Sequence, residues 1–257
     1  MTVEANLVDL ACRLADAAAR IAMTHFATGL HADTKADASP VTIADRQAEA
    51  AMRDIIEAEY PDHGIYGEEH GQVRTDAEYV WVLDPIDGTK SFVIGKPLFG
   101  TLIALLKDGK PVVGIINCSA LKERWLGTLG RPTTHNGKPI KTRACENLGD
   151  AWMASTSPGM FEGDAAAAFA SLKAATRQTV WGGDCHSYGL LASGTLDLVA
   201  ESGLQPYDYL ALVPVIEGAG GMISDWSGGA LGLSSDGTVL AAGDAQTHRS
   251  ARKLLMG

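Results

Sequence analysis

Hydrophobic positions near the start of the chain repeat with a helical period. Leucine, isoleucine and alanine recur every three or four positions between residues 7 and 25, which predicts a long amphipathic helix. After a polar, charged segment, a second helix is predicted to begin at Thr42, with Asp45 three positions further on, as at many helix starts. Both helices carry one apolar face and therefore pack on a larger apolar surface.

Apolar runs in the middle of the chain have the length of strands. Residues 79–83 read Tyr-Val-Trp-Val-Leu, which predicts a buried strand that stops at the following Asp-Pro. Residues 98–106 and 111–116 flank the turn sequence Lys-Asp-Gly-Lys, which predicts a hairpin, and residues 124–129 continue the sheet. This part of the chain is therefore predicted to form a sheet.

Strands and helices alternate in the last third of the chain. Helices are predicted over residues 165–175, 187–192, 207–217 and 246–255, with strands between them. This alternation is typical of α/β proteins. We predict one α/β domain over residues 1–257, with a division into two lobes, 1–146 and 147–257, compatible with the pattern.

Composition indicates a folded protein. The chain has 257 residues and is 46% hydrophobic, which is enough for a substantial core. It has no apolar stretch of the roughly 18 residues needed to span a membrane, and no basic start typical of a signal peptide, so a cytoplasmic location is expected. The cysteines lack metal-site spacing and are interpreted as thiols: Cys12, Cys118, Cys145 and Cys185.

The formal net charge of -10 disfavours nucleic acid as a partner, because phosphate backbones are bound by clustered Lys and Arg. We expect neither a nucleic-acid nor a membrane partner. An acidic protein can still bind a phosphate monoester if divalent cations, held by its carboxylates, invert the local field.

Two carboxylates follow the predicted strand at residues 79–83. Asp84 and Asp87 flank Pro85, and Gly88 and Thr89 come next. Ligand sites of α/β proteins commonly lie at the carboxyl ends of strands, and glycine lets the backbone approach an anion. The alternative is a simple turn, since Asp, Pro and Gly all favour turns.

Other acidic residues also lie at predicted element ends. Glu68 and Glu69 follow a short strand, and Asp208 opens a helix. The alternatives are a solvated surface pair for the glutamates and a helix-start carboxylate, favoured by the helix dipole, for Asp208.

Three segments together resemble the inositol monophosphatase family of magnesium-dependent, lithium-sensitive phosphatases. They are Gly67-Glu68-Glu69, residues 81–89 (Trp-Val-Leu-Asp-Pro-Ile-Asp-Gly-Thr) and Pro206-Tyr207-Asp208. Their order and spacing match the family along nearly the whole chain. The resemblance implies a layered αβαβα sandwich, a small-molecule phosphate ester as substrate, and a homodimer.

The resemblance also implies a metal site with two or three Mg²⁺ ions. Glu68, Asp84 and the carbonyl oxygen of Ile86 would bind one ion. Asp84, Asp87 and Asp208 would bind a second. Hard Mg²⁺ prefers oxygen ligands of these kinds.

Further roles are implied around this metal site. Backbone groups of Gly88 and Thr89 would bind the phosphate, and Thr89 with Asp45 would activate the attacking water. The reaction would be direct attack by water without a phosphoenzyme. Lys35 would help to order a third metal and Glu69 would support the site, although a solvated lysine and a surface carboxylate are the alternatives. The implied catalytic set is Asp45, Glu68, Asp84 and Thr89.

Substrate choice is predicted to depend on residues 181–189, which resemble the histidinol-phosphatase branch of the family. Its Gly-Gly-Asp sequence ends at Asp184, and Glu201 matches the family's substrate-contacting glutamate, with Asp208 also near the substrate. These carboxylates suit the cationic groups of L-histidinol phosphate, although Asp184 is also a candidate helix N-cap. His186 stands where an aromatic residue is expected. Alternative functions are an inositol-1-monophosphatase, a nucleotide 3'-phosphatase, or a regulator that binds phosphate esters without turnover.

Overall fold

The computed structural model describes residues 3–26, 33–34, 40–41 and 43–257. Within these ranges no helix is both long and apolar enough to cross a lipid bilayer. The α-helices are α1 (Ala5–His25), α2 (Ile43–Glu59), α3 (Thr89–Val93), α4 (Gly163–Ala175), α5 (Cys185–Ala192), α6 (Pro206–Tyr209), α7 (Leu212–Gly218) and α8 (Ala245–Met256).

Two large β-sheets organise the fold. The eight-stranded sheet has the order β10-β9-β8-β7-β6-β5-β3-β4. Its strands are β3 (Gly64–Gly67), β4 (Gln72–Val73), β5 (Tyr79–Asp87), β6 (Gly100–Lys107), β7 (Lys110–Cys118), β8 (Glu123–Thr128), β9 (Arg131–His135) and β10 (Lys138–Pro139). The five-stranded sheet has the order β12-β11-β13-β15-β14. Its strands are β11 (Trp152–Ser155), β12 (Gln178–Trp181), β13 (Leu198–Glu201), β14 (Met222–Ser224) and β15 (Val239–Ala242), and β1 (Asp33–Thr34) pairs separately with β2 (Pro40–Val41).

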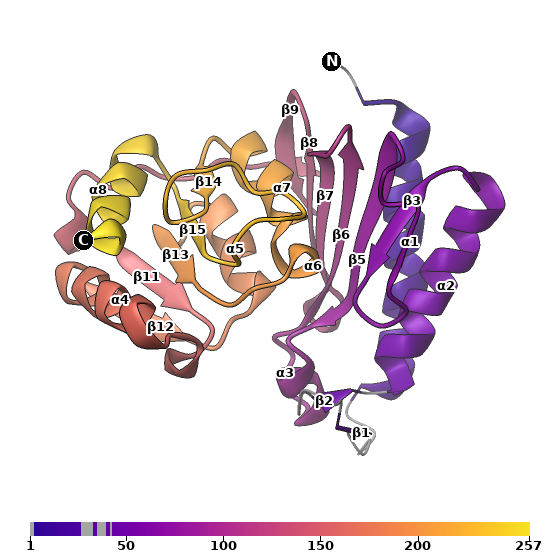
Figure 1. Cartoon of the computed structure of the whole chain (residues 1–257), viewed down its shortest axis with the longest axis horizontal. Helices are drawn as coiled ribbons and strands as arrows, with labels where there is room; N and C mark the ends of the chain where they lie inside the picture. The colour runs from indigo at the N-terminus through magenta and orange to yellow at the C-terminus, as the bar shows by residue number, and fades with distance from the viewer. Residues whose placement is uncertain (1–2, 27–32, 35–39, 42) are drawn as a thin grey trace.

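The elements stack in five alternating layers (Figure 1). Helices α1 and α2 cover one face of the larger sheet, α5, α6 and α7 lie between the two sheets, and α4 and α8 cover the outer face of the smaller sheet. Three main hydrophobic clusters fill the spaces between these layers. The predicted αβαβα sandwich is therefore confirmed.

Residues 79–83 of strand β5 form an unbroken apolar or aromatic run because both faces of the sheet are covered. Val80 and Val82 belong to the core between the two sheets, whereas Trp81 and Leu83 belong to the core beneath α1 and α2. Successive side chains of a strand point to opposite faces, so a strand buried on both sides reads as an unbroken apolar run.

Most predicted bounds lie within two residues of the structure, but two predicted elements differ more. Strand β5 continues past Asp84 to Asp87 through a shift in its register with β6, and the Thr101 hydroxyl donates to the carbonyl oxygen of Pro85 at 2.8 Å. Irregular pairing is what tolerates a proline inside a strand. The single helix predicted over 207–217 is two short helices, α6 and α7, because Pro214 has no N–H to donate to the carbonyl four residues earlier.

Glycines in the larger sheet let the middle helices lie very close to it. A Cβ atom on Gly114 would lie 2.0 Å from the carbonyl oxygen of Ala211, and one on Gly127 would lie 2.3 Å from backbone atoms of Pro214. The start of α7, with Ala211 just before it, therefore rests directly on β7 and β8. This close approach brings α6, which carries Asp208, to the larger sheet.

Candidate active site

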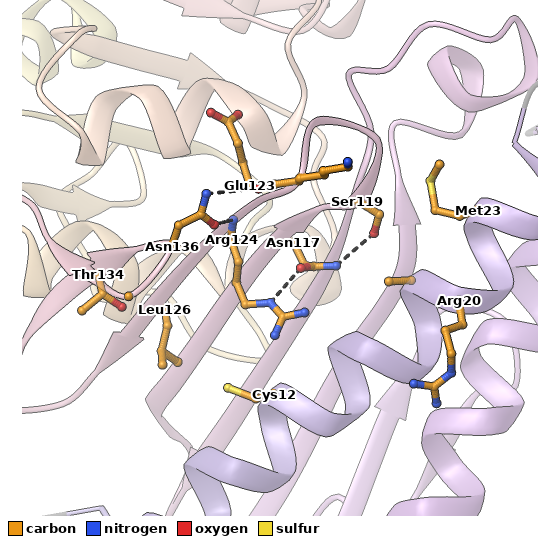
Figure 2. Close-up of a pocket in the computed structure, with 13 residues that line it drawn as sticks. Cys12, Arg20, Met23, Asn117, Ser119, Glu123, Arg124, Leu126, Thr134 and Asn136 are labelled. Atoms are coloured by element: carbon orange, nitrogen blue, oxygen red, sulfur yellow. Dashed lines mark hydrogen bonds between the residues drawn. The ribbon is translucent and has the colours of Figure 1, made fainter.

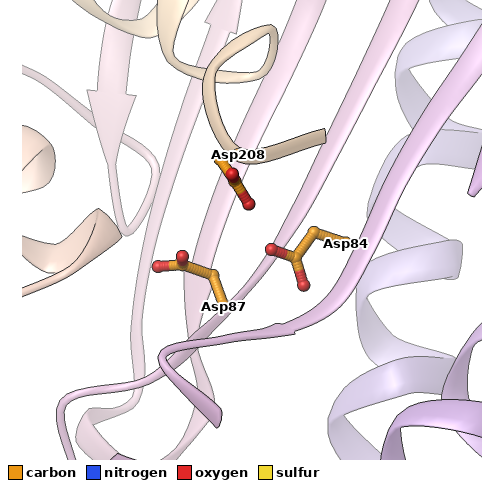
Figure 3. A group of neighbouring side chains, drawn as sticks. All are labelled: Asp84, Asp87 and Asp208. Carbon is orange, nitrogen blue, oxygen red and sulfur yellow. The ribbon is translucent and has the colours of Figure 1, made fainter. Parts of the chain in front are cut away.

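Three carboxylates meet where β5 ends and α6 begins. Asp84 and Asp87 come from β5 and Asp208 from α6, and their side chains point into one shared space (Figure 3). One oxygen atom of each lies within 4.8 Å of the others. At an effective dielectric constant near 20, each pair of ionised carboxylates at this separation repels by about 3 to 4 kcal/mol.

Asp84 is the most enclosed of the three. Its residue is 1% exposed, and its Oδ1 atom is buried without a hydrogen-bond partner among the residues that the structure describes. Burial raises the pKa of Asp84 well above its ordinary value, and the nearby charges of Glu68, Asp87 and Asp208 raise it further. A buried oxygen without a donor calls for a cation.

Backbone N–H groups orient the other two carboxylates. The N–H of Cys185 donates to Oδ2 of Asp87 at 2.7 Å, and the N–H of Gln205 donates to Oδ2 of Asp208 at 2.7 Å. Burial raises the pKa of Asp87 and raises that of Asp208 to about 7, while the bond from Gln205 partly opposes the change at Asp208. Asp208 also completes a capping box with Gln205. The residue therefore stabilises the start of α6, as the alternative interpretation predicted, and also belongs to the carboxylate cluster.

This donor set fits a hard divalent cation. It consists of carboxylate oxygens that repel one another when ionised, and one of them is buried without a hydrogen-bond partner among the described residues. Mg²⁺ is bound in proteins by such oxygens. The carbonyl oxygen of Ile86, predicted as a further ligand, accepts a hydrogen bond from the Thr89 hydroxyl at 3.1 Å.

Glu68 and Asp45 lie beside the cluster. Strand β3 pairs in parallel with β5, Gly67 opposite Leu83, so Glu68 follows directly beside Asp84. Asp45 projects from the first turn of α2 and is 1% exposed. The charges of Glu68 and Asp45 both contribute to the raised pKa of Asp84, which places both carboxylates near it.

Two further residues, Glu69 and Lys35, are predicted to support the site. The Glu69 side chain is nearly buried and lies 3.9 Å from the guanidinium of Arg46 on α2. Lys35 lies outside the described residues.

The backbone turns sharply at Gly88 to begin α3. Gly88 has a φ of 82°, and a Cβ atom there would lie 3.1 Å from the Leu98 carbonyl oxygen and 3.3 Å from the Asp184 carboxyl group. Glycine therefore suits both the left-handed conformation and the confined space. The first residue of the helix is Thr89.

A cavity of about 110 Å³ adjoins the carboxylate cluster. It is lined by Asp87, Thr156, Met160, Asp184, Cys185, Tyr188, Glu201, Leu204 and Asp208. Glu201 is 3% exposed and is held on both oxygens, by the N–H of Thr156 at 2.8 Å and by the hydroxyl of Tyr188 at 2.9 Å. The structure therefore brings both predicted specificity carboxylates to one cavity beside the cluster.

Asp184 occupies the N-cap position of α5, but its side chain makes no capping hydrogen bond. Burial raises the pKa of Asp184, while the charge of Lys96, a hydrogen bond with Ser91 and the charge of Lys90 oppose that rise. Lys96 also donates to the carbonyl oxygen of Gly182 at 2.8 Å, so it holds the turn that carries Asp184.

His186 does not line this cavity. Its ring lies 3.0 Å from the Glu123 carboxylate and meets the Trp125 ring edge-on, with ring centroids 5.7 Å apart. Residue 186 is thus directed at the larger sheet, because it follows Asp184 by about half a turn of α5.

Sequence reasoning missed the residues that hold the specificity carboxylates: Ser91, Lys96, Thr156 and Tyr188. Tyr188 had a usable signal, since it follows Asp184 by four positions and so lies on the same side of a helix. Thr156 contributes a backbone N–H, which residue types do not reveal.

A second cavity of about 690 Å³ lies away from the carboxylates, between α1 and strands β7 to β9 (Figure 2). One of the cations that line it, Arg124, pairs with Asp16 at 2.6 Å and donates a hydrogen bond to the amide oxygen of Asn117 at 2.7 Å. The charge of Arg124 is therefore already paired within the protein and is not free to bind a phosphate.

Comparison with known proteins agrees with this geometry. The model of the inositol monophosphatase family matches residues 4–255. The chain belongs to this family. Bifunctional phosphatase IMPL2 of Arabidopsis thaliana, described as chloroplastic, is 50% identical over 251 residues, which cover 94% of this chain and 72% of the relative.

Other members of the inositol monophosphatase family are also similar. A histidinol-phosphatase of Mycobacterium tuberculosis is 37% identical over 85% of this chain and 87% of its own. A solved structure of an inositol monophosphatase from Zymomonas mobilis has a TM-score of 0.91 and 49% identity, and covers 99% of this chain and 100% of that one. The chain is therefore a phosphatase of this family, with a phosphoric monoester as its class of substrate.

The carboxylate cluster predicts how stability depends on pH and on magnesium. The raised pKa values mean that the folded metal-free protein binds more protons than the unfolded chain between the ordinary Asp value of about 4 and about 7. The free energy of unfolding of this form should therefore fall as pH rises through that window. Saturating Mg²⁺ should raise the melting temperature most at and above pH 7, with about 2.7 kcal/mol expected at a hundredfold excess over Kd.

Thermal unfolding at several pH values, with EDTA or with Mg²⁺, measures both effects. Asp84→Asn is the control, because it removes one of the repelling charges and should flatten both responses. The prediction would be contradicted if the melting temperature in EDTA did not change with pH and did not rise when Mg²⁺ replaced EDTA.

Proposed function

We propose that the chain is a magnesium-dependent histidinol-phosphatase, which hydrolyses L-histidinol phosphate to L-histidinol and phosphate in histidine biosynthesis. The observation that carries this proposal is the cavity in which Asp184 and Glu201 adjoin the three-carboxylate cluster. The cluster suits the metal and phosphate end of the substrate. The two further carboxylates suit its cationic end.

Glu68, Asp84 and the Ile86 carbonyl oxygen would hold one Mg²⁺, and Asp84, Asp87 and Asp208 a second. Bound Mg²⁺ would lower the pKa of the attacking water and offset charge on the phosphate.

The chain's own groups then position the phosphate and accept the proton. Backbone N–H groups of Gly88 and Thr89 at the start of α3 would donate to phosphate oxygens. The carboxylate of Asp45 and the hydroxyl of Thr89 would orient the attacking water, with Asp45 accepting its proton. Water would attack phosphorus directly, and no covalent phosphoenzyme would form.

Specificity would come from charge. L-Histidinol phosphate carries an ammonium group, and an ionised carboxylate in a water-poor cavity binds a cation more strongly than it binds a neutral hydroxyl. The Gly88 turn lies within contact distance of Asp184, so one substrate can reach both. The 37% identity to a histidinol-phosphatase supports this choice.

A second candidate is an inositol-1-monophosphatase, favoured by the 49% identity to the Zymomonas mobilis structure. A nucleotide 3'-phosphatase and a phosphate-ester-binding regulator without turnover are the remaining alternatives. The homodimer and the cytoplasmic location stay predictions.

The decisive experiment measures phosphate release with Mg²⁺ from L-histidinol phosphate, inositol 1-phosphate and adenosine 3',5'-bisphosphate. We expect the highest kcat/KM for L-histidinol phosphate. In Asp184→Asn this value should fall by roughly 10- to 150-fold, because a hydrogen bond to a charged group contributes about 1.5 to 3 kcal/mol. Asparagine has nearly the same shape and size as aspartate, so the backbone at this position, with its positive φ of 45°, should be unchanged.

Asp164→Asn is the matched control, since Asp164 is exposed on α4. Preference for another ester would agree with phosphatase activity but would overturn L-histidinol phosphate as the substrate. Equal losses for all three esters in Asp184→Asn would show that Asp184 does not set specificity. Binding of the esters without release of phosphate would favour the regulator.

A further inference from the structure

The carboxylate of Glu49 lies behind the loop that carries Glu68, and no role described so far uses it. Glu49 belongs to α2 and is 0% exposed. Its Oε2 accepts a hydrogen bond from the N–H of Glu69 at 2.6 Å, and its Oε1 accepts one from the N–H of His70 at 3.1 Å. One side chain therefore fixes the two peptide groups that follow Glu68.

Neighbouring residues hold this carboxylate in place. The Nε of Arg53 donates to its Oε1 at 2.7 Å, and another guanidinium nitrogen of Arg53 donates to the carbonyl oxygen of Gly71. A Cβ atom on Gly67 would lie 1.9 Å from Oε1 of Glu49, so the carboxylate occupies the space that a side chain there would need. The buried charge is thereby paired and hydrogen-bonded, as buried charges must be.

The opposite side of the same loop is fixed by β5. The N–H of Glu68 donates to the carbonyl oxygen of Leu83, the residue before Asp84, at 3.2 Å. The backbone of Glu68 is thus held between β5 on one side and the Glu49 carboxylate on the other. Because Asp45 and Glu49 are four residues apart, one face of α2 serves both the carboxylate cluster and this loop.

We propose that Glu49 is a positioning residue, which fixes Glu68 relative to Asp84 and so sets the affinity of the site for its divalent cation. The inference rests on the metal site of the proposed function. Without the second carboxylate oxygen, one of the two N–H groups loses its acceptor, and the loop can shift away from Asp84. A shift of this loop weakens binding of the ion. Once the ion is bound, the steps of the reaction change little.

Manganese(II) binding to the protein without substrate, followed by electron paramagnetic resonance, tests this. In Glu49→Gln we expect Kd for Mn²⁺ to rise about 10- to 100-fold, as for other residues that orient metal ligands. We expect kcat at saturating Mg²⁺ to stay within about threefold of the unchanged protein, because the ligands themselves remain. A purely structural Glu49 would lower the melting temperature in EDTA and leave Kd unchanged.

Glu59→Gln is the matched control, because Glu59 is the exposed last residue of the same helix and pairs with Arg13 at 2.6 Å. Its Kd for Mn²⁺ should not change. If Glu49→Gln fails to fold, Arg53→Lys takes its place, and its Kd should rise in the same direction by a smaller factor.

The outcomes separate the two proposals. An unchanged protein that binds no Mn²⁺ overturns the metal site and hence the proposed function. The role of Glu49 alone is overturned if the unsubstituted protein binds Mn²⁺ and Kd is unaltered in folded Glu49→Gln. Where Glu49→Gln does not fold, an unaltered Kd in Arg53→Lys has the same meaning.

Discussion

Replacing Asp84 with Asn is expected to lower kcat/KM for every phosphate ester by at least about a thousandfold, which corresponds to roughly 4 kcal/mol of transition-state stabilisation. Asp84 would contact both metal ions, and its Oδ1 is buried without a hydrogen-bond partner in the described part of the chain. An amide has no charge and only one oxygen, so it cannot replace both contacts. Steady-state phosphate release with Mg²⁺ measures the loss.

Asp76→Asn is the control, because Asp76 is exposed in the loop between β4 and β5. The Asp84→Asn protein should remain folded and should melt higher in EDTA than the unchanged protein, since one of several repelling carboxylates is gone. Retention of more than a tenth of the activity would mean that Asp84 is not a shared metal ligand and that the proposed arrangement is wrong.

Replacing Asp45 with Asn is expected to lower kcat by about 10²- to 10⁴-fold, the usual contribution of a general base. Asp45 is buried close enough to Asp84 to raise its pKa, but it is not among the three carboxylates that converge. Its loss should therefore remove proton acceptance and leave the metal ligands in place. Kinetics at saturating Mg²⁺, with Mn²⁺ binding in parallel, would separate the two effects.

Asp54→Asn is the control on the same helix, because Asp54 is exposed. The prediction for Asp45 requires that Kd for Mn²⁺ change little while kcat falls. A large rise in Kd with kcat retained at saturating metal would instead make Asp45 a metal ligand. Activity unaffected by the substitution would remove Asp45 from the catalytic set.

The sequence by itself determined the elements and the residue types of the candidate site. The apolar run before Asp84 predicts a buried strand, and the two carboxylates and the glycine that follow it predict a ligand site at its end. The three linked motifs also led to the right family and to the layered fold. Such features are local, since each depends on neighbouring residues and on short periods.

The family resemblance implied that Asp208 joins Asp84 and Asp87, but only the tertiary structure shows how these distant groups meet. Asp208 reaches Asp84 because α6 rests on the larger sheet, and Asp184 lies beside Gly88 because α5 begins between the two sheets. The same packing directs His186 to Glu123 instead of the cavity, and places Glu49 against the backbone beyond Glu68. These contacts depend on how closely whole layers approach and on backbone N–H groups, and neither quantity is encoded in a local pattern of residue types.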